Sequence, residues 1–519
     1  MFASLAYALI NWLWRRSARL MLRIPAQRAA VAGGFVAALV YCLLAGYAVP
    51  AQRTLYMLGV VAVALWTQRT VAPSRVLALA LLLVLLLDPW AVLAAGFWLS
   101  FGAVGVLFYI GSGRLGSGHW LLEWGRAQWA VTLGSIPALL LLFQQFSLVS
   151  PLANAVAIPL VSLLITPLAL AAAVLPPLGF LLEPAHLLTS WLMAFIAWLA
   201  ALPWAVWQQH APPPWAWLTA LLGCCWLLLP RGFPARWLGL VALLPLLLLP
   251  PPRPAMGEAA LTVLDVGQGL AIHIQTAHHD LLYDTGPVYT SEANGGNRVI
   301  VPYLRAVGVT RLDGMVVTHQ DTDHSGGAEA VLDALPVAWL MSSLAYEHPF
   351  SALPVEAQSC AAGQHWDWDG VVFEVLHPPA GQYAAPTRKT NDMSCVVKVS
   401  NPHGKVLLTS DIEALSEQDL LTRAADKLRA DVLLVPHHGS RTSSTAEFIA
   451  AVAAPRVIFP VGYRNHFNHP RPEVMARYRN SAAQIYRTDL DGAVTVSLAA
   501  PALSIQTERN ARRRYWHGS

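Results

Sequence analysis

Charged side chains are scarce in this chain. Asp, Glu, Lys and Arg make up 12% of its 519 residues, hydrophobic residues make up 55%, and the formal net charge is only +4. This charge is too small for the length to indicate a particular partner, while the excess of hydrophobic residues is typical of a membrane protein. Leu, Ala, Val and Trp dominate up to about Pro250, and an ordinary mixture with most of the His begins near Gly257. We therefore expect more than one domain.

Cysteine is also scarce, and its spacing indicates no site. The five cysteines are Cys42, Cys224, Cys225, Cys360 and Cys395. They form no CxxC pattern and no evident disulfide framework, and the first three lie in apolar runs, which favours a role as small hydrophobic residues. The segment Met1–Trp14 lacks the basic start and the small-residue cleavage site of a signal peptide.

Long apolar runs fill the first half of the chain. A helix needs about 20 mostly apolar residues to cross a bilayer, and Trp and Tyr near the ends of several runs are typical of the membrane interface. We expect spans near residues 2–14, 29–49, 54–67, 76–95, 96–112, 129–146, 151–175, 178–201, 213–229 and 237–250. Because some runs are short, the sequence allows about eight to ten spans.

Helix-breaking residues interrupt these runs. They are Asp88-Pro89, Pro137, Pro159, Pro167 and Pro176-Pro177. In lipid, such breaks are tolerated only where protein or a water-filled cavity satisfies the freed backbone groups. Several broken helices in one bundle therefore indicate a transport path. The alternative, equally open from sequence, is that the breaks mark loops between short spans.

Arginines predict an orientation for the membrane half. A cluster follows the first predicted span: Arg15, Arg16, Arg19, Arg23 and Arg28. The positive-inside rule places this cluster in the cytoplasm. A ten-span count puts the later arginines on the same side: Arg69, Arg75, Arg114, Arg231 and Arg236. The last span then leads outward, so we expect the second half on the outer side, and one miscounted span would reverse this.

A proline-rich stretch, Leu249–Pro254, marks the passage from lipid to water. We predict a membrane domain over residues 1–250, a stiff linker over 251–258, a soluble domain over 259–500 and a basic tail over 501–519. Predicted strands of the soluble domain cover 260–266, 271–276, 280–284, 313–318, 371–376, 395–400, 405–409, 431–435 and 456–461. Predicted helices cover 297–307, 328–335, 412–424, 445–453 and 471–479. This order indicates two packed sheets with helices outside.

Metal-ligand chemistry is concentrated after the predicted strand Asp313–Thr318. Four potential ligands fall within the next six residues: His319, Asp321, Asp323 and His324. Imidazole nitrogen and carboxylate oxygen suit zinc, and an oxygen-rich set also suits manganese. The alternative interpretation is a solvated acidic loop.

Two further predicted strands also end in ligand residues. Leu407–Asp411 delivers a carboxylate that could bridge two metals, and Leu433–His437 delivers an imidazole. Because each strand fixes its last side chain, we favour a two-metal site, which can generate hydroxide and stabilise the entering and leaving oxygens of a phosphodiester.

These residues resemble a known family. The run His319–His324 resembles the HxHxDH signature of metallo-β-lactamase-fold hydrolases, and further segments resemble the ComEC family of DNA-internalisation competence proteins. The soluble segments are Leu264–Gly269, Tyr283–Gly286 and Pro436–Ser440, and the membrane segments are Tyr41–Thr54, Trp98–Gly105 and Pro151–Pro159. The resemblance covers nearly the whole chain. It implies a polytopic α-helical membrane domain followed by an α+β metallo-β-lactamase-like αββα sandwich.

The resemblance also implies a function. Members of the family form an inner-membrane channel that passes single-stranded DNA into the cell during natural transformation, and the tethered nuclease is thought to degrade the other strand. The implied partners are DNA, membrane lipid, other competence proteins and further copies of the chain. Such members usually carry an extra soluble domain, for which there is no room before Tyr41. We therefore expect a fragment, a short gene model or a shortened variant.

Carried over by position, the resemblance assigns a ligand set. One divalent metal ion, Mn or Zn, takes His319 and Asp321, and the other takes Asp323, His324 and His437, with Asp411 between them. Asp321 replaces an imidazole of the general signature, which moves the preference from zinc towards manganese.

Other residues are weaker candidates. Asp323 and His438 are candidate catalytic residues, although a helix-start or supporting role is equally open for His438. Asn391 or Asp392 lies where a third ligand could fall, and Ser440 could contact substrate. Candidates for orienting ligands are Asp265, Gln268 and Asp284, with turn chemistry as the even alternative.

Three further residues have possible substrate roles. His469 is more readily interpreted as a surface-loop residue than as a site residue, and Arg388 and Lys389 could meet backbone phosphates. No aromatic platform for stacking single strands is evident. Two rival functions remain: a membrane-anchored phosphodiesterase for a non-DNA substrate such as a cell-envelope phosphoester, and a transport protein with an inactive hydrolase domain.

Overall fold

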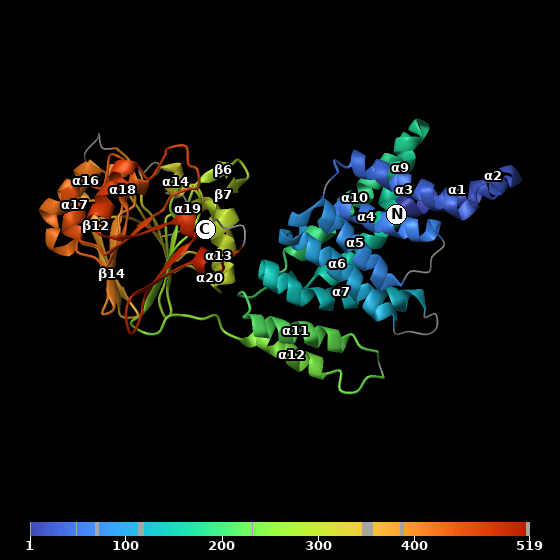
Figure 1. The fold of residues 1–519 in the computed structure, drawn as a ribbon, viewed down its shortest axis with the longest axis horizontal. Helices are drawn as coiled ribbons and strands as arrows, with labels where there is room; N and C mark the ends of the chain where they lie inside the picture. Colours follow the sequence, from blue (N-terminus) through green and yellow to red (C-terminus); the bar gives the residue numbers. More distant parts are fainter. Residues whose placement is uncertain are drawn as a thin grey trace. The chain divides into compact units, whose positions relative to one another are not determined.

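The computed structural model divides the chain into two compact units, Met1–Leu249 and Pro250–Ser519 (Figure 1). It describes residues 2–47, 49–67, 72–112, 119–230, 232–344, 356–384 and 389–514. Arg69, Arg114, Arg231 and Arg388, which entered the sequence predictions, lie outside the described residues. Each unit has its own hydrophobic clusters.

The first unit is helical. Its helices are α1 (Phe2–Trp14), α2 (Ala18–Arg23), α3 (Ala26–Leu44), α4 (Val49–Trp66), α5 (Pro73–Leu87), α6 (Ala95–Ser112), α7 (Trp120–Phe143), α8 (Ser150–Leu160), α9 (Thr166–Val174), α10 (Leu182–Ala200), α11 (Pro214–Leu227) and α12 (Leu238–Leu248). Every predicted span overlaps at least one of them.

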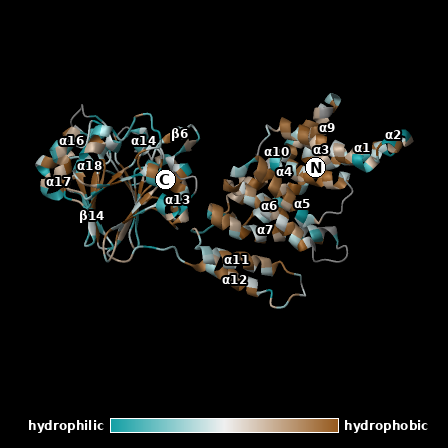
Figure 2. Ribbon diagram, in the orientation of Figure 1, coloured by the Kyte–Doolittle hydropathy of each residue, from teal (hydrophilic) through white to brown (hydrophobic). Residues whose placement is uncertain are grey.

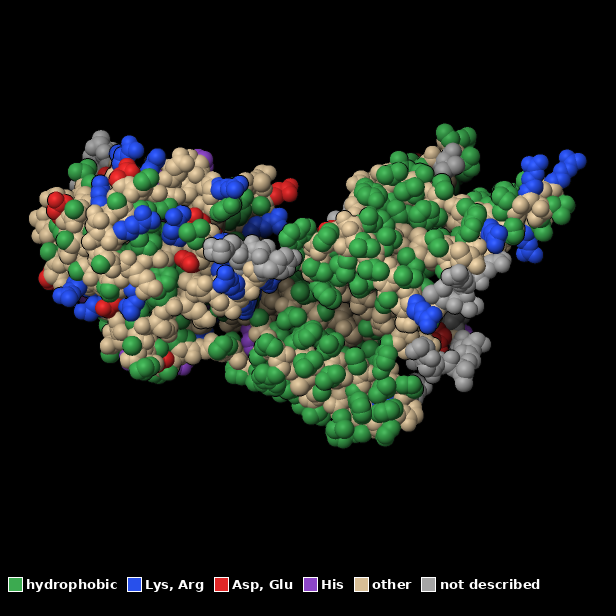
Figure 3. Space-filling model, viewed as in Figure 1, with side chains coloured by type: hydrophobic (Ala, Val, Ile, Leu, Met, Phe, Trp, Pro, Cys, Tyr) green, Lys and Arg blue, Asp and Glu red, His purple; other side chains and the backbone are tan. Residues whose placement is uncertain are grey.

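Four helical stretches are long and apolar enough to cross a membrane: Ala26–Leu44, Leu122–Phe143, Ser150–Ala173 and Pro176–Ala200. Five other apolar helices of this unit are shorter. Apolar side chains dominate the visible surface of the helical unit, and arginines gather around α2 (Figures 2 and 3). An apolar exterior with cations at one end is the pattern of a membrane protein.

The predicted helix breakers have two different outcomes. Pro137 lies inside α7, and Pro159 and Pro167 flank a π-helical segment, Val161–Ile165, that joins α8 to α9 without a loop. Asp88-Pro89 ends α5, and Pro176 starts a short 3-10 turn. Pro159 and Pro167 therefore border a distorted helical segment, Pro137 lies within a continuous helix, and the other prolines mark connections. Apart from its helices, the unit contains a two-stranded sheet in which β1 (Gln145–Ser147) pairs antiparallel with β2 (Val206–Gln208).

The second unit contains two large sheets. The first has the order β10-β9-β8-β5-β4-β3-β18-β19 and the second the order β11-β12-β13-β14-β15-β16-β17. The strands of the first sheet are β3 (Ala259–Val263), β4 (Ile272–Gln275), β5 (Asp280–Tyr283), β8 (Gly314–Val317), β9 (Trp339–Ser342), β10 (Glu356–Ser359), β18 (Val494–Leu498) and β19 (Ser504–Thr507). Those of the second are β11 (His365–Trp368), β12 (Val371–His377), β13 (Val396–Asn401), β14 (Gly404–Leu408), β15 (Val432–Leu434), β16 (Arg456–Phe459) and β17 (Gln484–Arg487).

The two sheets pack face to face with helices outside. One buried cluster joins side chains of both sheets, such as Ile272 and Phe373. A second cluster covers the outer face of the second sheet with α16 (Ala414–Arg423), α17 (Ala446–Val452) and α18 (Pro472–Asn480). A third covers the first sheet with α13 (Val301–Ala306) and α15 (Ala328–Ala334). The predicted αββα sandwich is confirmed.

The structure also adds elements that the sequence did not indicate. Residues 504–511, expected in a basic tail, form β19 and α20 (Glu508–Ala511), and β18 joins β19 to the first sheet. The predicted strands also omitted β9, β10, β11, β17 and β18. β10 is a short polar strand at a sheet edge and has no apolar period to detect. Smaller elements are β6 (Val288–Thr290), β7 (Ala293–Asn294), α14 (Thr322–Ser325) and α19 (Thr488–Asp491).

Two cysteines form a disulfide across the sandwich. Cys360 follows β10 of the first sheet, Cys395 precedes β13 of the second, and their Cα atoms are 6.0 Å apart. Both side chains are fully buried. No local spacing indicates this pair, because the two cysteines are 35 residues apart and meet only when the two sheets stack.

The predicted linker is attached to the soluble unit. Arg253 donates from Nε to the carbonyl oxygen of Ala277 at 2.8 Å, and its Nη2 lies 2.9 Å from Oδ2 of Asp280. The amide of Gly257 donates to the carbonyl of Asp369 at 2.7 Å. The linker is thus fixed to the β4–β5 and β11–β12 turns rather than free along its whole length.

Candidate metal centre

Four potential ligands converge where three strands end. Asp323 and His324 lie on α14 after β8, Asp411 follows β14, and His438 lies in the turn Pro436–Gly439 after β15. One ligand atom of each lies within 4.8 Å of the others. Three of the four residues are buried, and Asp323 is partly exposed. The group therefore opens to solvent on the side of Asp323.

The distances within this group suit a shared cation. His324 Nε2 lies 3.1 Å and His438 Nε2 lies 3.4 Å from Oδ1 of Asp411. His438 Nε2 is 3.4 Å from Oδ2 of Asp323, and the two Nε2 atoms are 3.2 Å apart. Two imidazole nitrogens and two carboxylate oxygens that face one point form a donor set for zinc or manganese.

The second nitrogen of each imidazole is also fixed. His324 Nδ1 lies 2.8 Å from Oδ2 of Asp284, and His438 Nδ1 donates to the carbonyl of Pro460 at 2.7 Å. Metal-binding histidines usually have such a partner, because it sets the tautomer and directs the other nitrogen to the metal. Asp284, left between orientation and turn chemistry by the sequence, has both features: it contacts His324, and its φ is +60°.

A buried polar network supports Asp284. Its Oδ1 accepts from the amide of Thr318 at 2.8 Å, and its Oδ2 accepts from Oγ1 of Thr318 at 2.9 Å. Oγ of Ser410 lies 2.6 Å from the Thr318 hydroxyl. The sequence predictions omitted Thr318 and Ser410. The available signal was their position, since each directly precedes a candidate ligand, His319 and Asp411.

His319 lies beside this group with a free ring nitrogen. Its side chain is 1% exposed, and within the described part of the chain its Nε2 has no hydrogen-bond partner. Burial, and then the charge of His324, lower the pKa of His319 to about 4, so the imidazole is neutral at pH 7. A buried nitrogen without a partner is costly, and a metal ion would satisfy it.

Asp321 is the neighbouring donor that could share a second metal ion with His319. Its Oδ2 is 3.7 Å from His319 Nε2, and the side chain is 42% exposed. Its Oδ1 accepts from Oγ1 of Thr390 at 2.8 Å. Asp323, His324, Asp411 and His438 therefore form the donor set for one metal ion, and His319 and Asp321 lie beside them as donors for a second.

His437 lies outside the four-residue group. Its Nε2 is 3.7 Å from Oδ2 of Asp411 and 3.4 Å from the side-chain nitrogen of Asn391. Its Nδ1 lies near Thr442 and Glu413. Because His437 and His438 both have left-handed φ, +48° and +54°, the turn separates their rings. The structure thus places His438 where the sequence expected His437.

The other sequence candidates make supporting contacts. The Asp392 carboxylate accepts from Ser416 at 3.0 Å, and Ser440 Oγ lies 3.1 Å from the Thr442 hydroxyl. Gln268 Oε1 accepts from the Gly462 amide at 3.3 Å. Asp265 accepts from the Gly267 amide at 3.4 Å. None of these contacts is with the four-residue group.

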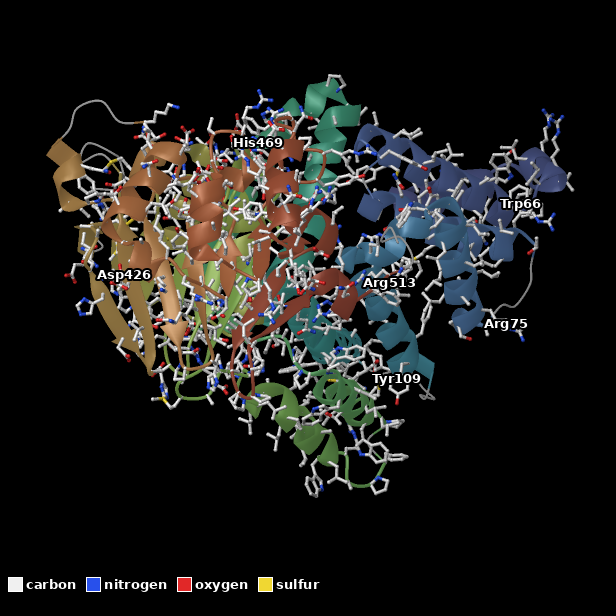
Figure 4. All side chains as sticks on the ribbon, turned by 60° about the vertical axis from the view of Figure 1, so that its left-hand side comes forward. Trp66, Arg75, Tyr109, Asp426, His469 and Arg513 are labelled. Carbon is white, nitrogen blue, oxygen red and sulfur yellow. A yellow bond between two sulfur atoms is a disulfide. The ribbon has the colours of Figure 1, made fainter. Side chains whose placement is uncertain are left out.

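Two further candidates lie near His437. Lys389 pairs with Glu413 at 2.9 Å, so its charge is already partly compensated. His469, labelled in Figure 4, is half-buried, and its ring centroid is 5.9 Å from that of His437. Burial, and then the charges of His438 and His437, lower the pKa of His469 to about 4.

The charges of the group depend on one another. Burial favours neutral forms, but the carboxylates raise the pKa of His438 to about 10 and raise that of His324 well above its usual value. In turn, and against burial, the imidazoles lower the pKa of Asp323 to about 2 and that of Asp411 well below its usual value. The two carboxylates therefore remain charged and require adjacent positive charge. A divalent cation supplies it while the imidazoles become neutral ligands.

Comparison with known proteins identifies relatives for both units. The family model described as "Competence protein" matches residues 1–234, and that of the metallo-beta-lactamase superfamily matches residues 264–462. The chain is 37% identical to "Competence protein ComA" of Neisseria gonorrhoeae over 98% of its own length and 71% of that protein. It is 30% identical to "Recombination protein 2" of Haemophilus influenzae, with 92% and 64% covered. It thus spans about two thirds of the length of these relatives.

Solved structures of metallo-beta-lactamase-fold proteins match part of the chain. The metallo-beta-lactamase fold protein YhfI of Bacillus subtilis is 11% identical, with a TM-score of 0.30 over 44% of this chain and 96% of that one. A diphosphatase from the PhnP family is 17% identical, with a TM-score of 0.29 over 47% of this chain and 98% of that one.

Metal content tests whether His438 or His437 is the metal ligand. We expect His438→Ala to weaken binding of manganese or zinc by more than the roughly 10- to 100-fold that loss of an orienting partner costs, because it removes a direct ligand. His437→Ala should retain most of the metal. Both variants of the purified full chain would be dialysed against each metal and analysed by mass spectrometry. Metal loss in His437→Ala but not in His438→Ala would reverse the assignment.

Proposed function

The chain belongs to the competence-protein family, and on that premise we propose that it carries single-stranded DNA across the inner membrane and hydrolyses the strand that does not enter. The observation that carries this proposal is the union, in one chain, of an apolar helical unit with a buried Asp-His group in a metallo-β-lactamase-like unit. Other competence proteins and further copies of the chain remain proposed partners.

The proposed hydrolase uses two divalent metal ions, manganese or zinc. Asp323, His324, Asp411 and His438 would hold one, and His319, Asp321 and Asp411 the other. Such ions lower the pKa of water and stabilise charge on a phosphodiester. The chain itself fixes the ligands, through Asp284 behind His324 and the Pro460 carbonyl behind His438. His437, 20% exposed beside Asp411, is placed to contact a substrate phosphate.

A nuclease assay tests this half of the proposal. Purified Pro250–Ser519 should cleave DNA with manganese or zinc and lose activity in chelator. Asp411→Ala should lower the rate by roughly 100-fold or more, because several kcal/mol of charge stabilisation depend on the metals. Asp426→Asn, an exposed carboxylate on another turn (Figure 4), is the matched control.

The assay also separates the rival functions. Cleavage of small phosphodiesters but never of DNA would favour a phosphodiesterase with another substrate. Metal-loaded protein without any hydrolytic activity would favour a transport protein with an inactive hydrolase unit.

A cavity in the helical unit supports the transport half of the proposal. Its volume is about 700 Å³, and α6, α7, β1 and α8 line it. Gln128, Thr132 and Ser135 form a polar stripe along one face of α7, and Asn154 on α8 also lines the cavity. Among the described residues its lining contains no charged side chain. The rest of the lining is mainly apolar, with residues such as Leu139 and Phe146. Irregular backbone in a membrane is tolerated where it is buried in protein or borders a water-filled cavity.

Cysteine labelling tests whether the cavity is a water-filled path. In a chain with Cys42, Cys224 and Cys225 replaced by Ser, we expect Thr132→Cys to react with a membrane-impermeant thiol reagent, because the cavity admits water. Single-stranded DNA should slow this reaction. Leu141→Cys, an exposed apolar position on the same helix, should stay unlabelled in vesicles. Equal labelling of both positions, or none at Thr132, would contradict the path.

The disulfide supports the outer side for the soluble unit. Disulfides persist in oxidising compartments and are rare in the cytosol, so the Cys360–Cys395 bond agrees with the orientation predicted from the arginine cluster.

Alkylation of the native protein tests this placement. After denaturation without reductant, we expect label on Cys42, Cys224 and Cys225, and none on Cys360 or Cys395, because the disulfide protects that pair. Mass spectrometry of peptides gives the readout, and a reduced sample labelled at all five positions is the control. Label on Cys360 and Cys395 without reduction would remove this support for an outer location.

A further inference from the structure

An exposed aromatic loop lies between β16 and α18. The segment 462–469, called here the 462–469 loop, contains Tyr463, Arg464 and Phe467. Tyr463 is 65% and Phe467 is 46% exposed, and Cζ of Arg464 lies 5.2 Å from the centroid of the Tyr463 ring. Exposed rings beside an exposed cation offer both a flat apolar face and a positive charge.

Both ends of the loop are attached to the candidate metal centre. Just before the loop, the carbonyl of Pro460 accepts from His438 Nδ1 at 2.7 Å. At its start, a Cβ on Gly462 would lie 2.5 Å from the amide nitrogen of Gln268, so only glycine fits this approach. Just after the loop, the amide of Arg471 donates to the carbonyl of Gly439 at 2.9 Å. The position of the loop is therefore set by the loops that carry the ligands.

A row of rings leads from the loop to the ligands. Ring centroids are 5.8 Å apart between Phe467 and His469, at an interplanar angle of 23°. They are 5.9 Å apart between His469 and His437. His437 Nε2 is in turn 3.7 Å from Oδ2 of Asp411. The exposed ring of Phe467 is thus two rings away from a candidate metal ligand.

The loop is also organised internally. The side chain of Asn465 donates to the carbonyls of Gly462 at 3.0 Å and His469 at 2.7 Å, and it accepts from the His469 amide at 2.9 Å. Because these bonds span the loop, its backbone is held in place before anything binds. Such preorganisation lowers the entropic cost of binding.

We propose that the 462–469 loop is a stacking platform for the bases of single-stranded DNA, with bases on Tyr463 and Phe467 and a phosphate at Arg464. This inference rests on the proposed nuclease function. Bases of a single strand expose their faces and stack on aromatic side chains without sequence preference, whereas a duplex keeps those faces covered. The stacked bases lead the backbone towards His437 and Asp411.

Substrates with and without bases test the platform in the full chain. Tyr463→Ala with Phe467→Ala should raise the KM for oligo-dT roughly 10- to 100-fold and leave that for an abasic oligonucleotide of the same length unchanged. Tyr463→Phe with Phe467→Tyr keeps both rings and should behave like the parent chain. Arg464→Ala should weaken binding of both oligonucleotides and reduce the salt slope by about 0.7.

A binding measurement keeps the test independent of hydrolysis. Fluorescence anisotropy of labelled oligo-dT in chelator should show the same loss in the double Ala variant, even if the chain cleaves no DNA. Equal affinity of the parent chain for oligo-dT and abasic strand would overturn the proposal. So would unchanged oligo-dT binding in the double Ala variant, or a loss of binding to anionic lipid vesicles in place of oligo-dT.

Discussion

The hydrogen bond between Asp284 and His324 is the contact on which the rest of the soluble unit depends. Asp284 follows β5, Thr318 follows β8 and Ser410 follows β14, so their side chains join the ends of strands from both sheets. Asp284 is fully buried with φ at +60°. Such a residue is tolerated because both of its carboxylate oxygens accept hydrogen bonds. The same hydrogen bonds therefore both join the two sheets and orient the ligand His324.

The sequence predicted the sandwich and most of the helical unit, because apolar periodicity and strand-end ligands are local signals. Strand ends rich in His and Asp predicted Asp323, His324 and Asp411 as metal ligands, and the structure brings these three together. The choice between His437 and His438 could not be predicted in this way, since it depends on two consecutive left-handed residues. The Cys360–Cys395 bond and the approach of the 462–469 loop to Gln268 join segments far apart in the chain, so no local pattern reveals them.

The two units meet different physical demands. In the helical unit, Pro137, Pro159 and Pro167 remain inside helices, and the polar stripe of α7 lines a cavity. In the soluble unit, irregular backbone gathers at the ligand-bearing turns and at the 462–469 loop. In both, departures from regular structure occur where the proposed activities need polar groups, while apolar packing elsewhere supplies stability.

The attachment of Arg253 changes how the connection between the units should be viewed. A proline-rich spacer is usually counted at its full length, but Arg253 is held by Ala277 and Asp280. What is left between the end of α12 at Leu248 and this anchor reaches ~18 Å at full extension. The free connector between the two units is therefore short, so it gives each unit a high effective concentration near the other.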